Sequence, residues 1–176
     1  MTTTSHDKVL AAALEVLREQ GTVSLDTAAR RAEMTKPGVM HHFLTKEALM
    51  LGLVDHVANR WHTDLLQHLP AGVDDPSAKQ RMRAYLDYSL TTQFDATDLV
   101  VLGDVRLRAS LAERWSANIG PWLEIGDEVP ASQRAALIAV RLIADGLWFA
   151  TAAAVCPITA PDRDLVRAVT NDLLKD

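Results

Sequence analysis

The sequence predicts an all-α protein with a small N-terminal head and a larger helical body. Apolar residues recur at helical spacing along the 176-residue chain, glycine and proline separate the segments, and no convincing alternating strand pattern is found. A chain of this length can hold a module of about 45 residues joined to a larger domain. We therefore expect about nine helices, with domains spanning 1–46 and 47–176.

The first two helices of the head are predicted from one apolar face and two punctuating residues. A helix over 6–20 is expected, and Gly21 can end it in the left-handed conformation. Ser24 can then cap a second, short helix that runs to Ala32. The apolar face of the first helix consists of Val9, Leu10, Ala13, Leu14 and Leu17.

Two further helices follow after short turns. Thr35 can cap a third helix that has Lys36 and Pro37 in its first turn, where proline is tolerated. Thr45 starts a fourth helix, which is expected to continue to about His68 and to leave the head for the body. Its apolar positions are Leu49, Leu53, Val57, Trp61 and Leu65.

The body begins after a linker rich in proline, glycine and aspartate at 69–76. Helices are predicted at 77–93, 97–109, 111–125, 131–155 and 161–175, and Pro130 and Pro161 mark two of the starts. The segment 135–156 approaches a membrane span in length and apolarity, but Arg141 and Asp145 lie near its centre. A buried or dimer-forming helix is therefore favoured over a membrane span.

Composition and charge describe a soluble globular protein with an uneven charge distribution. The formal net charge is -5, whereas residues 1–46 carry six basic and five acidic residues and are therefore slightly positive. Cys156 is the single cysteine, which excludes an intrachain disulfide, and the first eight residues lack the pattern of a secretory signal. We expect a cytoplasmic protein. Because the bulk charge is this weak, any binding to nucleic acid would depend on individually placed residues and helix ends.

Residues 24–43 contain the motif that indicates function, because two short helices there share a tight turn. Ala29 allows the helices to cross closely, and the small core that fixes their angle can be supplied by Ala32, Met34, Val39 and Phe43. The third helix is then expected to enter the major groove, with Lys36 near a guanine edge or a phosphate and Gly38 allowing close backbone approach. A packed helical subdomain without DNA binding is the alternative interpretation.

The run TKPGVMHHFLTKEAL at residues 35–49 resembles the recognition helix and following turn of the TetR family of one-component repressors. The resemblance covers about residues 8–55. It implies phosphate contacts from Thr35, His41, His42 and Lys46, and base contacts from Lys36, Pro37, Gly38 and Val39. Ser24 and Met40 complete the candidate DNA-binding set.

This chain departs from the family pattern at two positions. Met40 stands where the family usually has a tyrosine, so an apolar touch on a thymine methyl can replace a phosphate-bonding hydroxyl. Glu33 stands where glycine commonly makes the turn, and holding it left-handed costs about 1 kcal/mol. A metal site at His41 and His42 is disfavoured, because adjacent residues point to different helix faces and no third ligand lies at a recognisable spacing.

The body has aromatic residues that could line an effector pocket, although each alone is more often a core residue. The resemblance to efflux-pump regulators suggests a cationic organic effector, for which Asp87, Asp104 or Asp145 could provide charge. The candidate effector-binding residues are Trp61, Tyr85, Tyr88, Trp115, Trp122, Asp145, Trp148 and Phe149. We expect no cofactor.

The expected function is that of a ligand-responsive repressor. Two chains would pair through the last two long helices and place their heads about 34 to 36 Å apart on a near-palindromic operator. The effector would release the operator by tilting the fourth helix, and the controlled gene would serve efflux or detoxification. An architectural or protein-interaction module without an effector is the alternative, whereas no motif typical of an enzyme is present.

Overall fold

The computed structural model describes residues 4–175, and every regular element within that range is helical. The all-α prediction is therefore confirmed. The described residues form two compact units. Unit 1 contains the residues up to Arg60 together with Asp95–Asn118, and unit 2 contains Trp61–Phe94 and the residues from Ile119 onward. The chain thus enters unit 1 twice, and two of its helices contribute residues to both units.

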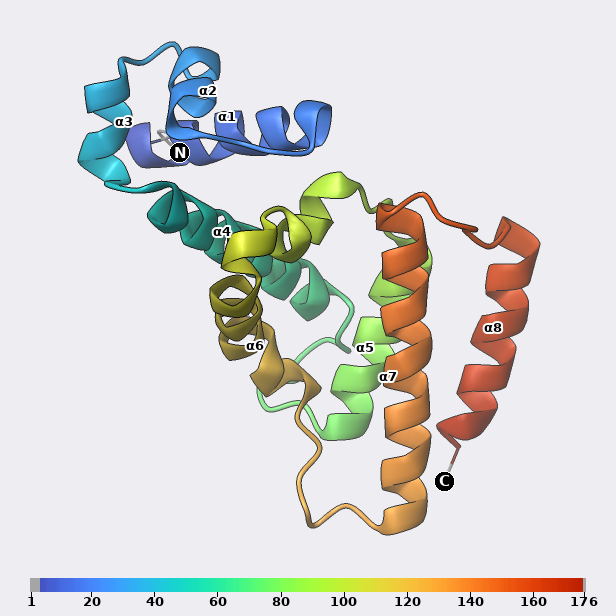
Figure 1. The fold of residues 1–176 in the computed structure, drawn as a ribbon. Coiled ribbons are helices and arrows are strands. Elements are labelled where there is room, and N and C mark those ends of the chain that lie inside the picture. Colours follow the sequence, from blue (N-terminus) through green and yellow to red (C-terminus); the bar gives the residue numbers. More distant parts are fainter. Residues whose placement is uncertain (1–3, 176) are drawn as a thin grey trace. The chain divides into compact units, whose positions relative to one another are not determined.

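The head helices of unit 1 begin and end close to the predicted residues (Figure 1). Thr4 and Asp7 form a capping box at the start of the first helix, and Gly21 ends it with φ of 71°. Ser24 caps the second helix by accepting a hydrogen bond from the Thr27 N–H at 3.1 Å. The helices are α1 (Ser5–Gln20), α2 (Leu25–Arg31) and α3 (Lys36–His42).

The turn between α2 and α3 has the predicted left-handed residue. Glu33 has φ of 54°, and the next residue, Met34, donates its N–H to the Ala29 carbonyl at 2.9 Å. Ala28, Ala29 and Val39 are buried on either side of this turn. The hydrogen bond and the small buried residues hold the two helices at a close crossing, as a helix-turn-helix requires.

Helix α4 (Lys46–Gln67) begins in unit 1, where Gly52 allows it to approach the head core closely. A Cβ atom at Gly52 would lie 2.7 Å from Cε1 of Phe43 and 3.4 Å from Cδ2 of Leu10. Phe43 follows α3 and is buried, so its ring has little freedom to move away. A glycine at this position is therefore a packing requirement of the head.

The prediction of one α-helix over 97–109 is wrong. The structure has two short 3-10 helices there, η1 (Ala96–Leu102) and η2 (Val105–Leu107). Asp95 accepts a hydrogen bond from the Thr97 N–H at 2.7 Å, and Asp104 accepts one from the Arg106 N–H at 2.9 Å. Each aspartate thus bonds the backbone two residues on, which favours a tight turn over a regular α-helix. Helix α6 (Arg108–Leu123) follows directly.

Three ion pairs hold the 95–107 segment on the rest of unit 1. Arg18 Nε lies 2.9 Å from Asp95 Oδ2, and Lys46 Nζ lies 2.6 Å from Asp104 Oδ2. The third pair joins Arg60 to Asp98, whose side chain is almost completely buried. A piece of chain far from the head in sequence therefore contacts α1 and α4 within this unit.

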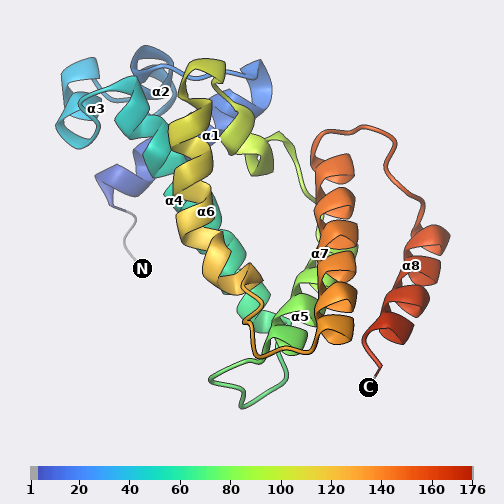
Figure 2. The ribbon, with the colours of Figure 1, turned by 60° about the horizontal axis from the view of Figure 1, so that its bottom comes forward.

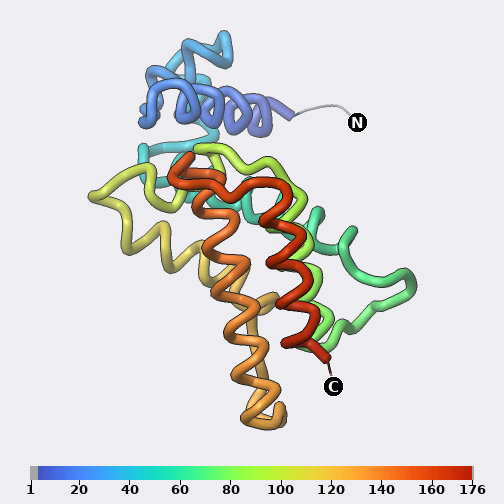
Figure 3. The backbone as a smooth tube through the Cα atoms, turned by 90° about the vertical axis from the view of Figure 1, so that its right-hand side faces the viewer, coloured from blue at the N-terminus to red at the C-terminus, as the bar shows by residue number. Residues whose placement is uncertain are grey.

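Unit 2 is built around helices α5 (Ala78–Thr91), α7 (Ala131–Ala152) and α8 (Ala160–Leu173). Helix α5 packs along α7 through buried apolar residues, and α8 runs antiparallel beside α7 (Figures 1 and 3). Figure 2 shows the same α5, α7 and α8 arrangement from another side. Ser77 caps α5 through a capping box with Gln80.

Helix α7 is the one element of residues 4–175 that is long and apolar enough to cross a membrane. Core helices of soluble proteins pass the same test, so length and hydropathy alone decide little. Arg141 Nε lies 3.6 Å from Asp145 Oδ2 one turn along the helix. Two charged residues in the middle of α7 would be costly in the centre of a bilayer. The pair therefore favours packing of α7 against other helices over insertion into a membrane.

Candidate DNA interface and effector site

The outward face of α3 is defined by burial. Lys36, Pro37, Met40 and His41 are exposed, whereas Val39 is fully buried in the head. The spacing of the exposed residues is that of one helical face. The predicted base-contacting side chain of Val39 is thus part of the core, and the face that DNA could meet consists of the other four residues.

Several predicted DNA-binding residues already have partners within the head. Lys36 Nζ donates to Asp26 Oδ2 at 3.0 Å, and both side chains are about half exposed. The Thr35 hydroxyl accepts from the Gly38 N–H at 3.2 Å and so caps α3. Ser24 plays the same capping role for α2. Because the Lys36 pair is exposed, it is weak, and Lys36 can exchange Asp26 for a phosphate or base at little cost.

Histidine side chains gather at the C-terminal end of α3. The His41 and His42 ring centroids are 5.4 Å apart, and the His6 ring from α1 lies 6.0 Å from His42 and 4.8 Å from Phe43. Within residues 4–175, no group of three or more metal-ligating side chains is found. The partly buried His42 thus packs against the head, while His41 is exposed on the outward face of α3.

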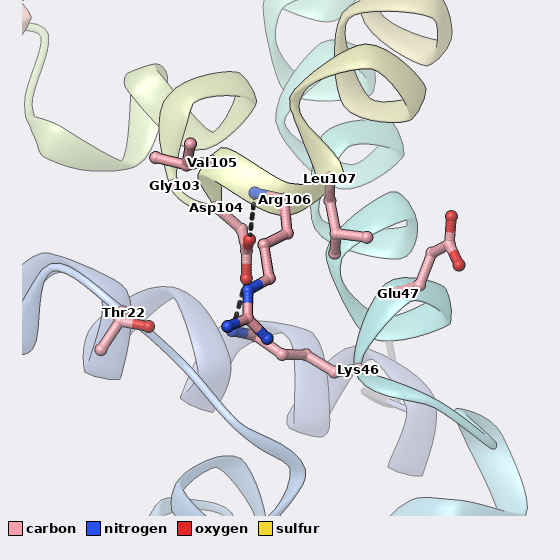
Figure 4. Close-up of a pocket in the computed structure, with 8 residues that line it drawn as sticks. All are labelled: Thr22, Lys46, Glu47, Gly103, Asp104, Val105, Arg106 and Leu107. Atoms are coloured by element: carbon pink, nitrogen blue, oxygen red, sulfur yellow. Dashed lines mark hydrogen bonds and ion pairs between the residues drawn. The ribbon is translucent and has the colours of Figure 1, made fainter.

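Lys46 lies at the edge of a hollow of about 490 Å³ in unit 1 (Figure 4). Figure 4 shows the Asp104 carboxylate between Lys46 Nζ, at 2.6 Å, and the Arg106 N–H, at 2.9 Å. These hydrogen bonds, that of Lys46 first, lower the pKa of Asp104 below its ordinary value. Lys46 is therefore held by a carboxylate, and a phosphate would have to compete for it.

The structure brings four aromatic residues of unit 2 around the fully buried Trp61. Its ring centroid lies 5.3 Å from Trp148, 5.4 Å from Tyr88 and Phe94, and 6.3 Å from Tyr85. These residues come from α4, α5, the loop after α5, and α7. We call them the aromatic cluster: Trp61, Tyr85, Tyr88, Phe94 and Trp148.

Carboxylates bind both tyrosine hydroxyls of the aromatic cluster. The Tyr85 hydroxyl donates to Asp145 Oδ1 at 2.7 Å, and the Tyr88 hydroxyl donates to Asp64 Oδ2 at 3.3 Å. Burial, followed by the negative charge of Asp145, raises the pKa of Tyr85 well above its ordinary value. The cluster is thus an apolar, aromatic environment with negative charge at its edge. Asp64 was not among the predicted site residues, because a single carboxylate on a helix carries no distinguishing pattern.

Comparison with known families decides the class of protein. Residues 9–53 match the family model described as bacterial regulatory proteins, tetR family, and residues 79–175 match the one described as tetracyclin repressor-like, C-terminal domain. The chain belongs to the tetR family. It is a transcription regulator with a DNA-binding N-terminal domain and a ligand-binding C-terminal domain, and it is not an enzyme. No curated protein sequence matches it.

Solved structures share the fold of this tetR-family protein at low sequence identity. The multidrug binding protein EbrR complexed with malachite green is 20% identical, covers 97% of this chain and 98% of its own, and has a TM-score of 0.64. EbrR complexed with imidazole is 19% identical over 99% and 97% of the two chains, with a TM-score of 0.60. Salmonella enterica GusR is 16% identical over 98% and 96%, with a TM-score of 0.58.

Three predicted aromatic effector residues of this regulator lie outside the aromatic cluster. Trp122 donates its indole N–H to the Arg81 carbonyl at 3.2 Å and packs against His62, so it belongs to another part of unit 2. Trp115 belongs to unit 1. Phe149 touches the Trp148 ring at 6.0 Å between centroids but is 45% exposed. Helical spacing could not separate these residues from the cluster, because their position depends on tertiary packing.

An exposed apolar stripe runs along α7 and α8 of this regulator. On each helix the stripe residues are separated by about one or two turns, so they lie on one face. Gly146 lies between Leu142 and Phe149 on α7, and a Cβ atom at Gly146 would meet nothing within 4 Å. The stripe consists of Ile138, Leu142 and Phe149 on α7 and of Leu165, Val169 and Leu173 on α8.

Proposed function

We propose that this tetR-family regulator is a cytoplasmic homodimeric repressor that binds a near-palindromic operator through α3 and is released by a small cationic aromatic effector. The observation that carries the proposal is the outward face of α3, where Lys36, Met40 and His41 are exposed while Val39 anchors the helix. A short helix presented in this way fits the major groove of duplex DNA. The caps at Thr35 and Ser24 support the same role, because they fix the helix before DNA arrives.

Selection of bound fragments from random duplex DNA with the purified protein tests operator binding. A two-fold symmetric consensus with half-sites about one helical turn apart is expected. Enrichment of no sequence would contradict the proposal. The selected operator then provides the probe for every later measurement.

The apolar stripe on α7 and α8 supports the homodimer. Exposed apolar side chains on two neighbouring helices can pack against a second copy of the same surface and so complete a four-helix bundle. Gly146 lies within this face and leaves room for a partner helix.

We expect Gly146→Arg to yield monomers in sedimentation equilibrium. Gly120→Arg is the matched control, since a Cβ atom at Gly120 also meets nothing within 4 Å and Gly120 lies outside the stripe. A stable Gly146→Arg dimer would exclude this interface.

The aromatic cluster, with Asp145 and Asp64 at its tyrosine hydroxyls, supports a cationic aromatic effector. Aromatic faces attract a delocalised cation, and a carboxylate at the edge neutralises it. EbrR, which shares the fold, has been solved with malachite green, a cationic triaryl dye. We infer that the controlled gene serves efflux or detoxification, since EbrR, which shares the fold, is described as a multidrug binding protein.

Malachite green is therefore the first probe for the effector site. Dye at a hundredfold excess over its dissociation constant should stabilise the protein by about 2.7 kcal/mol and displace it from the selected operator. Asp145→Asn should weaken dye binding, whereas Asp172→Asn, at an exposed acid of α8, should not. No shift in melting temperature with the dye or with other cationic and neutral aromatic compounds would favour a DNA-binding module without an effector.

A further inference from the structure

The outward face of α3 has apolar side chains at its centre. Lys36 begins the face and is paired with Asp26, and His41 is the last residue of the face and has a ring contact to His42. Between them lie Pro37 and Met40, which have no side-chain hydrogen-bond donor or acceptor suited to a base edge. Met40 is 37% exposed, although the preceding residue, Val39, is fully buried.

The chemistry of the major groove limits what such a centre can recognise. Base edges there carry hydrogen-bond donors and acceptors, and the one apolar group among the unmodified bases is the C5-methyl of thymine. An apolar side chain facing a donor or acceptor would leave that group without water or a partner, which is unfavourable. Contact with a methyl group instead removes apolar surface of both partners from water.

We propose that Met40 reads the C5-methyl group of a thymine in each operator half-site. The inference rests on the proposed function and adds a named specificity-determining residue to it. The unbranched thioether of methionine is long and adaptable, which suits contact with a methyl group on the floor of the groove. A thymine at the matching position is therefore preferred because of the helix itself, independently of the contacts made by Lys36.

Replacement of single thymines by deoxyuridine in the selected operator tests this directly. Deoxyuridine keeps every hydrogen-bonding group of thymine and lacks only the methyl. We expect one thymine position in each half-site to respond. Replacement in a single half-site removes one methyl contact and should lower the affinity of the wild-type protein by about fourfold. Replacement in both half-sites should lower it by about fifteenfold. Deoxyuridine at the other thymines should have little effect.

Variants of the protein assign the methyl contact to a side chain. Met40→Ala should bind the thymine and deoxyuridine operators equally, whereas Met40→Leu should still prefer thymine. Leu66→Ala, at an exposed leucine of α4, is the matched control and should keep the full preference.

Two results would overturn the inference while leaving operator binding intact. One is a wild-type protein that binds both operators equally. The other is loss of the thymine preference in Leu44→Ala rather than in Met40→Ala, since Leu44 is 75% exposed in the turn after α3. Failure to select any operator would instead refute the proposed function, so the two failures are distinguishable.

Discussion

Helix α3 and the aromatic cluster arrange their side chains in opposite ways. The α3 face takes its residues from one seven-residue helix, exposes them, and is fixed by a local cap at Thr35. The aromatic cluster takes mostly buried residues from α4, α5, the loop after α5 and α7, and fixes them by mutual packing around Trp61. A substitution on α3 can therefore change recognition without changing stability, whereas a substitution in the cluster changes both.

The largest effect is expected from Trp61→Ala, because it removes the centre of the aromatic cluster. Truncation of a fully buried tryptophan leaves a cavity and should lower the free energy of unfolding by about 3 to 5 kcal/mol. Urea unfolding monitored by circular dichroism measures this loss. Leu66→Ala, at an exposed position, should change stability by less than about 0.5 kcal/mol. A small effect of Trp61→Ala would mean that the cluster does not determine the stability of unit 2.

Gly52→Ala should have the next largest effect on stability. The new Cβ atom would lie 2.7 Å from the buried Phe43 ring, and such overpacking costs about 1 to 3 kcal/mol. Gly120→Ala in α6 is the control, since it has open space around it and should gain up to about 1 kcal/mol of helix propensity. Equal melting temperatures for the two variants would show that α4 does not approach the head core this closely.

The contrast between local and non-local structure also explains what could be predicted from the sequence. The caps at Ser24 and Thr35, the end of α1 at Gly21 and the left-handed Glu33 depend on neighbours within a few residues, and the structure has all of them. The outward face of α3 depends on the same local spacing. Val39, which was expected both in the small core of the turn and near the bases, is buried because one side of this seven-residue helix packs on the core.

The non-local features could not be obtained in this way. The sequence grouped Trp122 and Trp115 with Trp61, because aromatic residues at helical spacing do not reveal which helices meet. The 3-10 helices at 96–107 were not predicted, because their apolar spacing also fits an α-helix. Asp95 and Asp104 instead accept hydrogen bonds from backbone N–H groups two residues on, and these bonds favour tight turns over an α-helix. Gly52 gave no signal, since its role depends on the ring of Phe43.

On the α3 face, Lys36→Ala should weaken operator binding and leave stability almost unchanged. Loss of a base or phosphate contact costs about 1 to 3 kcal/mol of binding free energy, and for a phosphate contact the salt slope falls by about 1. The exposed Lys36–Asp26 pair contributes little to folding, so the melting temperature should not move. Fluorescence anisotropy with the selected operator measures the affinity. Lys8→Ala removes the same charge elsewhere on the head, and an equal loss there would mean that binding depends on charge alone.

The smallest effect concerns the edge of the aromatic cluster, where Tyr85 donates to Asp145 at 2.7 Å. Burial and the Asp145 charge raise the pKa of Tyr85 in the folded protein, so folding favours the protonated phenol. This contribution to stability is complete below the unfolded pKa of about 10 and is lost as the pH rises through the folded pKa.

Tyr85→Phe should therefore be less stable than wild type by about 1 kcal/mol at pH 8, and the difference should shrink above about pH 10. Chemical unfolding of both proteins between pH 8 and pH 11 gives the difference in their free energies of unfolding. Lysine titration does not affect this difference, because both proteins have the same lysines. Parallel profiles would mean that Tyr85 ionises as freely in the folded chain as in the unfolded one, and the aromatic cluster would then be open to water at Asp145.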